Sequence, residues 1–273
     1  MKKLLIVMLI LAVLVIPAYG ADETVGVCLD YMDAQTALYA ECALGDYTAD
    51  AMRESLGTDV SVIPGSMISG ELGYGSITEE DVLKLFANND LLVTVTISPS
   101  ELKEMLERSV SETVLTDEET IDAELSASDA FLQVSGFRFV YNPAAEAGER
   151  VMSVTLDSGG ELDLFDKDPY LTLCAPLSVV QDEYAVQTES AIRLSDAFSS
   201  YLHDHGTSPA TLNRIRAAGS GENTIISMIP KSLLWAALVV FLLFGILSPK
   251  IHEKKADRKV QKSKVFSKDY FYQ

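Results

Sequence analysis

Residues 91–110 read LLVTVTISPSELKEMLERSV and join a strand to a helix with no long loop between them. The first seven residues are Leu, Val, Thr and Ile, a composition that favours a strand. Ser98-Pro99-Ser100-Glu101 has the pattern of a capping box with proline at the first helical position. Four apolar residues then share one helix face: Leu102, Met105, Leu106 and Val110.

Similar signals on both sides of this stretch predict further elements. Strands are expected over residues 24–29, 59–63, 134–141, 150–156 and 170–174, and helices over 45–56, from Thr78 onward and over 188–203. Thr78 and Asp81 form a second capping pattern, and Gly57 is expected to end the first helix. Helices and strands mix without a regular βαβ rhythm, which predicts an α+β fold of mixed or antiparallel sheets flanked by helices.

The first twenty residues have the layout of a secretory signal peptide. Lys2 and Lys3 precede an apolar run over residues 4–16, and Ala18 and Gly20 stand three and one residues before a cut ahead of residue 21. The alternative is an uncleaved membrane anchor, but the run is short for a membrane span.

Residues 232–249 form a second apolar run and predict one transmembrane helix. Lys231 and Lys250 flank it, and Trp235 lies where interfacial aromatic residues are common. A buried core helix is the alternative, but the basic tail over 250–273 argues against it. We therefore expect a single-pass cell-membrane protein with an extracytoplasmic domain over 21–220, a linker over 221–231 and a cytoplasmic C-terminus.

Charge and cysteine content restrict the functions of the outer part. Residues 21–230 hold 10 Lys and Arg against 37 Asp and Glu, a net charge of −27. This field repels nucleic acid and anionic membrane surfaces. The cysteines are Cys28, Cys42 and Cys174, so an exported domain keeps at least one free thiol. Cys28 and Cys174 lie in apolar strand-like runs, and a Cys28–Cys42 bridge is left open.

No group of residues has the pattern of a catalytic centre. His203 and His205 are two positions apart on a predicted helix and point to different faces, so a shared metal is awkward. The acidic stretch 112–129 lacks the alternation of a calcium loop and is interpreted as a solvated, mobile insertion. We predict no catalytic residue, no metal site and no cofactor in this chain.

The stretch IPGSMISGELGYGSITEEDV, residues 63–82, holds four glycines within eleven residues. It is either a backbone cradle for a phosphate or a surface turn. No lysine follows in the way a P-loop requires, so the phosphate hypothesis has no support from that motif.

Three segments in this order resemble the C-terminal domain of the 5′-nucleotidase family. They are ECALGDYTADAMR at 41–53, ITEEDV at 77–82 with LVTVTI at 92–97 and Leu102-Lys103, and FLQVSGFRF at 131–139 with Tyr141-Asn-Pro143 and GERV at 148–151. The resemblance runs from about residue 24 to about 215. In this family of periplasmic UDP-sugar hydrolases and surface ecto-5′-nucleotidases, an N-terminal metallophosphatase domain carries the metals and the C-terminal domain binds the nucleoside. The resemblance implies that this chain holds only the C-terminal part.

The resemblance also places the nucleotide-pocket positions, and most of them are substituted here. The family loop Asn-Gly-Gly-Gly-Ile-Arg falls on residues 64–69, so that Pro64, Gly65, Ser66 and Ser69 occupy pocket positions. The first stacking phenylalanine of the family falls on Asn88, and Phe86 lies two residues earlier. The second falls in the region of Asp182 and Tyr184. A second family arginine falls near Leu38, where none is present. Lost arginines and stacking rings predict weak nucleotide affinity, because a stacked base contributes about 1–3 kcal/mol.

We therefore expect a membrane-anchored binding or scaffold module that is non-catalytic by itself. One alternative is the accessory half of a split nucleotide hydrolase, whose partner is a separate metallophosphatase chain or other membrane protein. Another is a sensor of a different small extracellular ligand.

Overall fold

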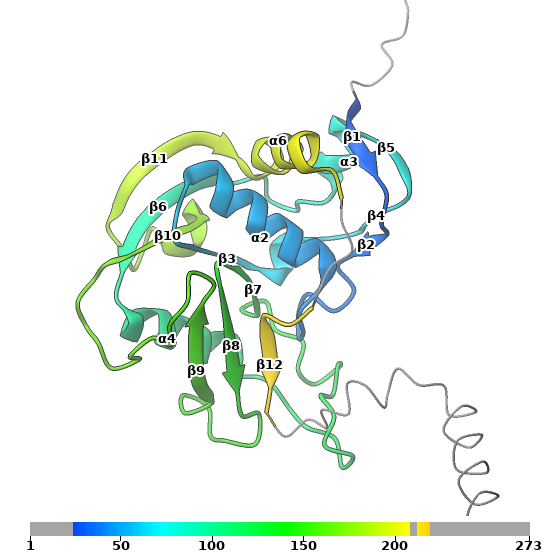
Figure 1. Cartoon of the computed structure of the whole chain (residues 1–273). Helices are drawn as coiled ribbons and strands as arrows, with labels where there is room; N and C mark the ends of the chain where they lie inside the picture. The colour runs from blue at the N-terminus through cyan, green and yellow to red at the C-terminus, as the bar shows by residue number, and fades with distance from the viewer. Residues whose placement is uncertain (1–23, 208–211, 219–273) are drawn as a thin grey trace, which may run out of the picture. The chain divides into compact units, whose positions relative to one another are not determined.

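A five-stranded sheet lies at the centre of the fold. The computed structural model describes residues 24–207 and 212–218. The strands are in the order β11-β6-β10-β3-β7 (Figure 1). Their bounds are Val60–Pro64 for β3, Leu91–Ile97 for β6, Leu132–Ser135 for β7, Leu171–Pro176 for β10 and Val186–Arg193 for β11. β10 runs parallel to β3 and antiparallel to β6, and the other neighbours are antiparallel, so the sheet is mixed.

The two faces of this sheet carry separate cores. Helices α2 (Ala43–Leu56) and α6 (Leu194–His205) lie side by side over one face, and α3 (Glu79–Lys84) packs with α6 (Figure 1). Helix α4 (Pro99–Ser109) and a three-stranded sheet of order β12-β8-β9 cover the other face. Side chains that alternate along each strand explain the division: Val62 packs into the α4 core and its neighbour Ile63 into the α2 core.

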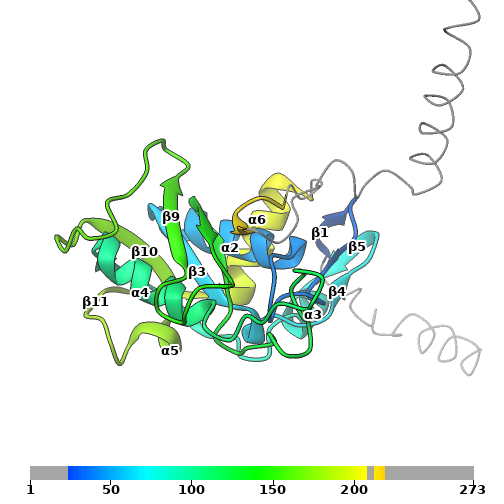
Figure 2. The same cartoon turned by 90° about the horizontal axis from the view of Figure 1, so that it is seen from below.

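Smaller elements complete the domain. The three-stranded sheet consists of β8 (Phe137–Tyr141), β9 (Val151–Leu156) and β12 (Ile215–Ala217). Two short pairs join β1 (Thr24–Cys28) to β5 (Gly75–Thr78) and β2 (Met32–Asp33) to β4 (Glu71–Leu72). A 3₁₀ turn, η1 (Gly65–Met67), follows β3, and the short helix α5 (Leu177–Val180) follows β10. Figure 2 shows β1 and β5 at one side of the domain and α4 and α5 at the other.

The helix-start and helix-end predictions are confirmed. Ser98 accepts a hydrogen bond from the Glu101 N–H, the Glu101 carboxylate accepts one from the Ser98 N–H, and α4 begins at Pro99. Thr78 and Asp81 make the same reciprocal pair at α3. Helix α2 ends at Gly57, whose φ of 63° is in the left-handed region that glycine adopts without strain.

Two element predictions are wrong in part. The single strand expected over 134–141 is broken at Gly136, whose φ is 85°, and its halves belong to different sheets. A Cβ at Gly136 would lie 2.2 Å from the Asp59 carbonyl oxygen, so this crossing point requires glycine. The helix expected over 188–203 begins only at Leu194, because residues 186–193 pair with β6 as strand β11.

The acidic stretch 112–129 is hydrogen-bonded to the domain at several points. The Ser128 N–H donates to the Leu38 carbonyl at 2.9 Å, and the Arg150 guanidinium donates to the Thr113 carbonyl at 2.9 Å. The Ser66 hydroxyl donates to the Asp129 carbonyl at 2.9 Å. Glu118 and Glu119 are exposed, as a solvated segment requires. Its mobility stays a prediction.

All three cysteines lie within the described residues and are free and buried. The Cys28–Cys42 bridge that the sequence left open is therefore not formed. The described residues contain no helix long and apolar enough for a membrane crossing. The predicted signal peptide (1–20), linker (221–231), transmembrane helix (232–249) and tail (250–273) all lie outside the described residues.

Candidate functional site

The sheet brings the three predicted pocket segments to one end of the domain. The loop over 64–69 follows the carboxyl end of β3, and residues 177–184 follow the carboxyl end of β10, which is parallel to β3. Residues 86–90 lead into β6, which is antiparallel to β10. All three segments must therefore meet at the same end of the sheet.

Gly65 in the first segment is fixed by packing and by an internal hydrogen bond. Its N–H donates to the Phe131 carbonyl at 2.7 Å. A Cβ at this position would lie 1.9 Å from the Ala37 carbonyl oxygen, a distance that no side chain tolerates. The glycine is thus required by the close approach of the chain at Ala37, and its N–H already has an acceptor.

The polar side chains of the same loop also make internal bonds. The Ser66 hydroxyl donates to the Asp129 carbonyl at 2.9 Å. The Ser69 N–H donates to the Leu85 carbonyl at 2.7 Å, and its hydroxyl lies 3.3 Å from the Lys84 and Leu85 carbonyls. Pro64, the last residue of β3, is half-buried and has no N–H to offer. The loop forms a turn here, and the Ser66 hydroxyl and the N–H and hydroxyl of Ser69 all face backbone carbonyl oxygens of the same domain.

Phe86 is part of the α2 core. Only 5% of its surface is exposed, and its ring meets Phe198 of α6 edge to face at 5.7 Å between centroids. Phe86 also forms an isolated bridge with Ile68, which ties it to the first segment. The ring is therefore not free to stack on a ligand. Asn88, which occupies the position of the family phenylalanine, is exposed.

Asp182 and Tyr184 lie at the other core. Asp182 is exposed, whereas Tyr184 is half-buried and packs against the α4 core. Burial raises the pKa of the Tyr184 hydroxyl, and Arg108 opposes that change. Phe86 and Tyr184 thus pack on opposite faces of the sheet, and the structure does not bring them together as a pair of stacking rings.

Two residues that hold this end together were missed from the sequence. The Asp90 carboxylate accepts the Ser178 N–H at 2.8 Å and so joins the second segment to the third. The Asn89 side chain exchanges two hydrogen bonds with Ser195, the second residue of α6. The polar run Asn88-Asn89-Asp90 directly before a strand was the available signal, since such side chains hydrogen-bond to backbone at element ends.

A charged cluster joins α2 to β12. The buried Glu41 carboxylate accepts the N–H groups of Asn213, Arg214 and Ile215 at 3.0–3.1 Å. The Arg214 guanidinium makes a bidentate pair with Asp50 at 3.0 and 2.8 Å. These bonds attach β12 and the two residues before it to Glu41 and to the first turns of α2.

Asp46 is the member of this cluster whose carboxyl is buried and incompletely hydrogen-bonded. It is 4% exposed, its Oδ1 has no hydrogen-bond partner, and its Oδ2 lies 3.5 Å from the Arg214 Nε. Burial raises the pKa of Asp46 to about 9; Glu41 and Asp50 add to the rise, and Arg214 opposes it. Burial therefore favours the protonated form of this carboxyl, and the nearby Arg214 favours the charged form.

Among the described residues, no group of three or more His, Cys, Asp or Glu side chains is placed to hold a metal ion. The two histidines of α6 make separate contacts: His203 with Asp204 at 2.9 Å, and His205 with Glu54 of α2 at 2.7 Å.

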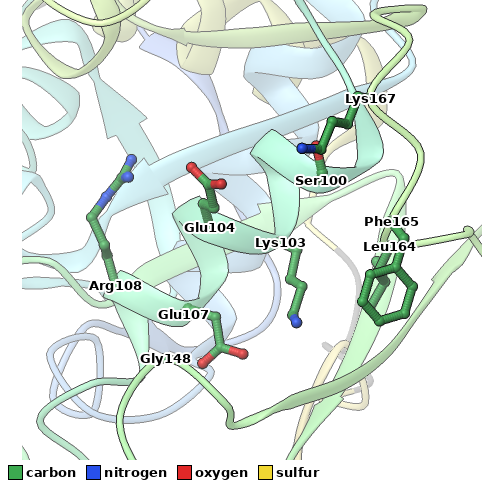
Figure 3. A pocket seen from close by; sticks show the side chains of 9 residues that line it. All are labelled: Ser100, Lys103, Glu104, Glu107, Arg108, Gly148, Leu164, Phe165 and Lys167. Carbon is green, nitrogen blue, oxygen red and sulfur yellow. The ribbon is translucent and has the colours of Figure 1, made fainter.

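A hollow of about 520 Å³ lies beside α4 (Figure 3). Its walls come from α4, from Gly148 in the turn between β8 and β9, and from residues 164–167 before β10. None of the eight predicted pocket positions lines it. Arg108 in its wall pairs with Glu183 at 2.8 Å, so the hollow adjoins the segment over 177–184.

The mixed sheet, its two covered faces and the loops at one end define an α+β domain with a loop-built site. The family model described as "5'-nucleotidase, C-terminal domain" matches residues 21–174, which is more than half of the chain. The chain belongs to this family, which is known as a substrate-binding module. The resemblance seen in the sequence is thereby confirmed.

Solved structures show the same fold. A 5'-nucleotidase precursor from Thermus thermophilus is similar with a TM-score of 0.61 at 20% identity, over 79% of this chain and 42% of that one. An NAD nucleotidase from Haemophilus influenzae is similar with a TM-score of 0.58 at 16% identity, over 72% of this chain and 39% of that one. The chain thus spans about two fifths of the length of these relatives. None of the curated proteins compared with the chain matches it.

Proposed function

We propose that this protein is a membrane-anchored, extracytoplasmic binding or scaffold module that does not hydrolyse nucleotides by itself. The anchor rests on the apolar run 232–249 and its basic flank, and the outer location rests on the signal-peptide pattern over 1–20. The domain between them belongs to a substrate-binding family.

One observation carries the non-catalytic part of the proposal. The Gly65 N–H, the Ser69 N–H and hydroxyl, and the Phe86 ring all make contacts inside the protein. The Gly65 N–H is bound to Phe131, the Ser69 hydroxyl lies against the Lys84 and Leu85 carbonyls, and the Phe86 ring packs on Phe198. A site that recognises phosphate needs free donors, and one that recognises a base needs a free ring face.

The test is phosphate release by the full-length chain, purified in a non-ionic detergent. The chain is incubated with nucleoside 5′-monophosphates and Mn²⁺ or Mg²⁺, and inorganic phosphate is measured. We expect no release above that of a mock preparation. The proposal would be overturned by metal-dependent phosphate release that co-elutes with the chain through successive chromatography steps and whose rate is altered in the variant Asn88→Ala.

The same assay is repeated after addition of a separate metallophosphatase chain. If a separate metallophosphatase chain restores hydrolysis and co-purifies with this protein, the chain is the accessory half of a split hydrolase. The scaffold proposal then gives way to that alternative, because binding would serve catalysis. If addition of such a chain changes nothing, the module acts without it.

A further inference from the structure

Residues 212–218, the last described segment of the chain, form a strap at the edge of the three-stranded sheet. Strand β12 within this strap runs parallel to β8 (Figure 1). The strap buries little apolar surface: Ala217 is buried, Ile215 is half-buried against the α4 core, and Leu212 is 52% exposed. Because apolar burial is small, the strap depends on its polar contacts to stay attached to the domain.

These polar contacts converge on one buried carboxylate and one arginine. The Glu41 carboxylate, 9% exposed, accepts the backbone N–H groups of residues 213–215 at 3.0–3.1 Å. The Arg214 guanidinium pairs with Asp50 on α2 and donates to a backbone carbonyl of β7 at 2.9 Å. Glu41 therefore holds the backbone of the strap, and Arg214 attaches its side chain to two elements of the domain.

The cluster around Arg214 holds more carboxyl groups than cations. Three carboxyl groups, those of Glu41, Asp46 and Asp50, contact this residue. Arg53 is the second cation, and it reaches Asp50 only through a serine hydroxyl of β7. The fully ionised cluster would carry three negative charges against two positive ones, so a single proton on one carboxyl balances it.

Asp46 is the carboxyl group best placed to take up that proton. Its Oδ1 is buried without a donor, so an ionised carboxylate would lose hydration there and gain no hydrogen bond in exchange. Burial raises the Asp46 pKa, and a side-chain hydrogen bond with Glu41 adds to the rise. Such a bond between two carboxyl groups requires a proton. Arg214 and the N-terminus of α2 favour the charged form, and Asp50 opposes it.

Other titratable groups lie around this cluster. Cys42 precedes α2, and Tyr201 faces the cluster from α6; burial raises the pKa of both, so neither is charged near neutral pH. His205 of α6 pairs with Glu54 at 2.7 Å, and its ring centroid is 4.3 Å from that of Tyr201. The variant His205→Gln therefore has to separate the contribution of this histidine from that of Asp46.

We propose that the strap is locked by a proton: it is closed while Asp46 and Glu41 share a proton, and it is released when that proton is lost. Loss of the proton leaves two buried carboxylates close together where Glu41 holds the strap backbone. Detachment of β12 admits water to both and relieves their repulsion. It also frees the edge of β8 over residues 139–141, which can then pair with another strand. The strap acts in this way whether or not the domain binds a nucleotide.

The experiment is hydrogen–deuterium exchange of the full-length chain in non-ionic detergent at pH 6, 7 and 8, read by mass spectrometry. Uptake is compared with that of the unfolded chain at each pH, which gives a protection factor for each peptide. We expect the protection factor of the strap to fall up to about tenfold per pH unit, because opening releases one proton. At each pH it should be lower than that of β6, since the strap opens without the rest of the domain.

Variants decide which group holds the proton. Asp46→Asn keeps the shape of the side chain, can donate to Glu41 and has no proton to lose. Its strap protection factor should therefore change less than about twofold from pH 6 to pH 8. Glu41→Gln should lower strap protection at least about tenfold already at pH 6, because hydrogen bonds to a charged acceptor are lost. His205→Gln and Asp157→Asn are the controls and should keep the pH dependence of the unaltered chain.

Three results would overturn the proposal. One is a strap protection factor that changes less than about twofold between pH 6 and pH 8 in the unaltered chain. Another is a pH dependence that Asp46→Asn retains or His205→Gln abolishes. The third is equal protection of the strap and β6 at every pH, because the strap would then open only when the whole domain unfolds. Circular dichroism checks that each variant is folded, and the pH profile of the unaltered chain tests the proposal if a variant is not.

Discussion

Replacement of Asp46 by Asn is expected to change how stability depends on pH. The folded chain raises the Asp46 pKa from 3.8 to about 9, chiefly by burial. Between these values the folded state holds a proton that the unfolded chain has released. Stability due to this group is therefore complete below about pH 4 and is lost as the pH rises toward 9.

The magnitude follows from the width of the window. Each pH unit in which one proton is bound only by the folded state costs about 1.4 kcal/mol, so the change from pH 5 to pH 8 costs up to about 4 kcal/mol. This is a large part of the roughly 5–15 kcal/mol typical of a domain. Asn has nearly the same shape and no titrating proton, so Asp46→Asn should flatten the decline.

The assay is urea unfolding followed by circular dichroism at pH 5 and pH 8, for the unaltered chain and for Asp46→Asn. Asp157→Asn, at an exposed carboxylate 3.5 Å from Arg138, is the control and should follow the unaltered chain. If the free energy of unfolding falls by the same amount from pH 5 to pH 8 in Asp46→Asn and in the unaltered chain, Asp46 does not hold the extra proton and the reasoning fails.

Three other outcomes follow from the packing. Gly65→Ala should lower the free energy of unfolding by about 2–3 kcal/mol, since its Cβ would lie 1.9 Å from the Ala37 carbonyl oxygen. Gly73→Ala, at a position with open space, is the control and should change it little. Equal urea midpoints for the two variants would refute this prediction. Ser98→Ala should cost about 1 kcal/mol through loss of the α4 cap, measured in the same way, and an unchanged midpoint would contradict it. The Cys174 thiol, fully buried and with its pKa raised to about 12 by burial, should react with a thiol reagent only after unfolding; rapid labelling of the native chain at this residue would count against the structure.

Local chemistry made much of the fold predictable. The capping boxes at Ser98 and Thr78 and the glycine after α2 depend on residues three or four positions apart, and each was found where the sequence placed it. The strand over 91–97 has the same bounds in the structure. Such signals do not need knowledge of distant partners.

Contacts between distant residues account for what was missed. Residues 186–193 become a strand because β6 offers its edge, and nothing within the segment reveals this. Gly136 divides a continuous apolar run because the Asp59 backbone lies against it. The burial of Phe86 depends on Phe198, more than a hundred positions away, so the sequence could not show that the ring is unavailable.

The candidate site was also predictable only in part. The resemblance located the loops over 64–69 and 86–88, and the structure joins them through Ser69 and the Ile68–Phe86 bridge. The hollow beside α4 is built by residues from three separate segments, and no motif marks it.

The most direct test of the central claim is calorimetric titration of the full-length chain with adenosine monophosphate, beside the variant Asn88→Ala. The internal bonding of Gly65 and Ser69 and the burial of Phe86 predict no saturable binding by the unaltered chain up to about 1 mM. Binding in the micromolar range that Asn88→Ala weakens at least about tenfold would contradict the account, because it would show that the loops still form a nucleotide site.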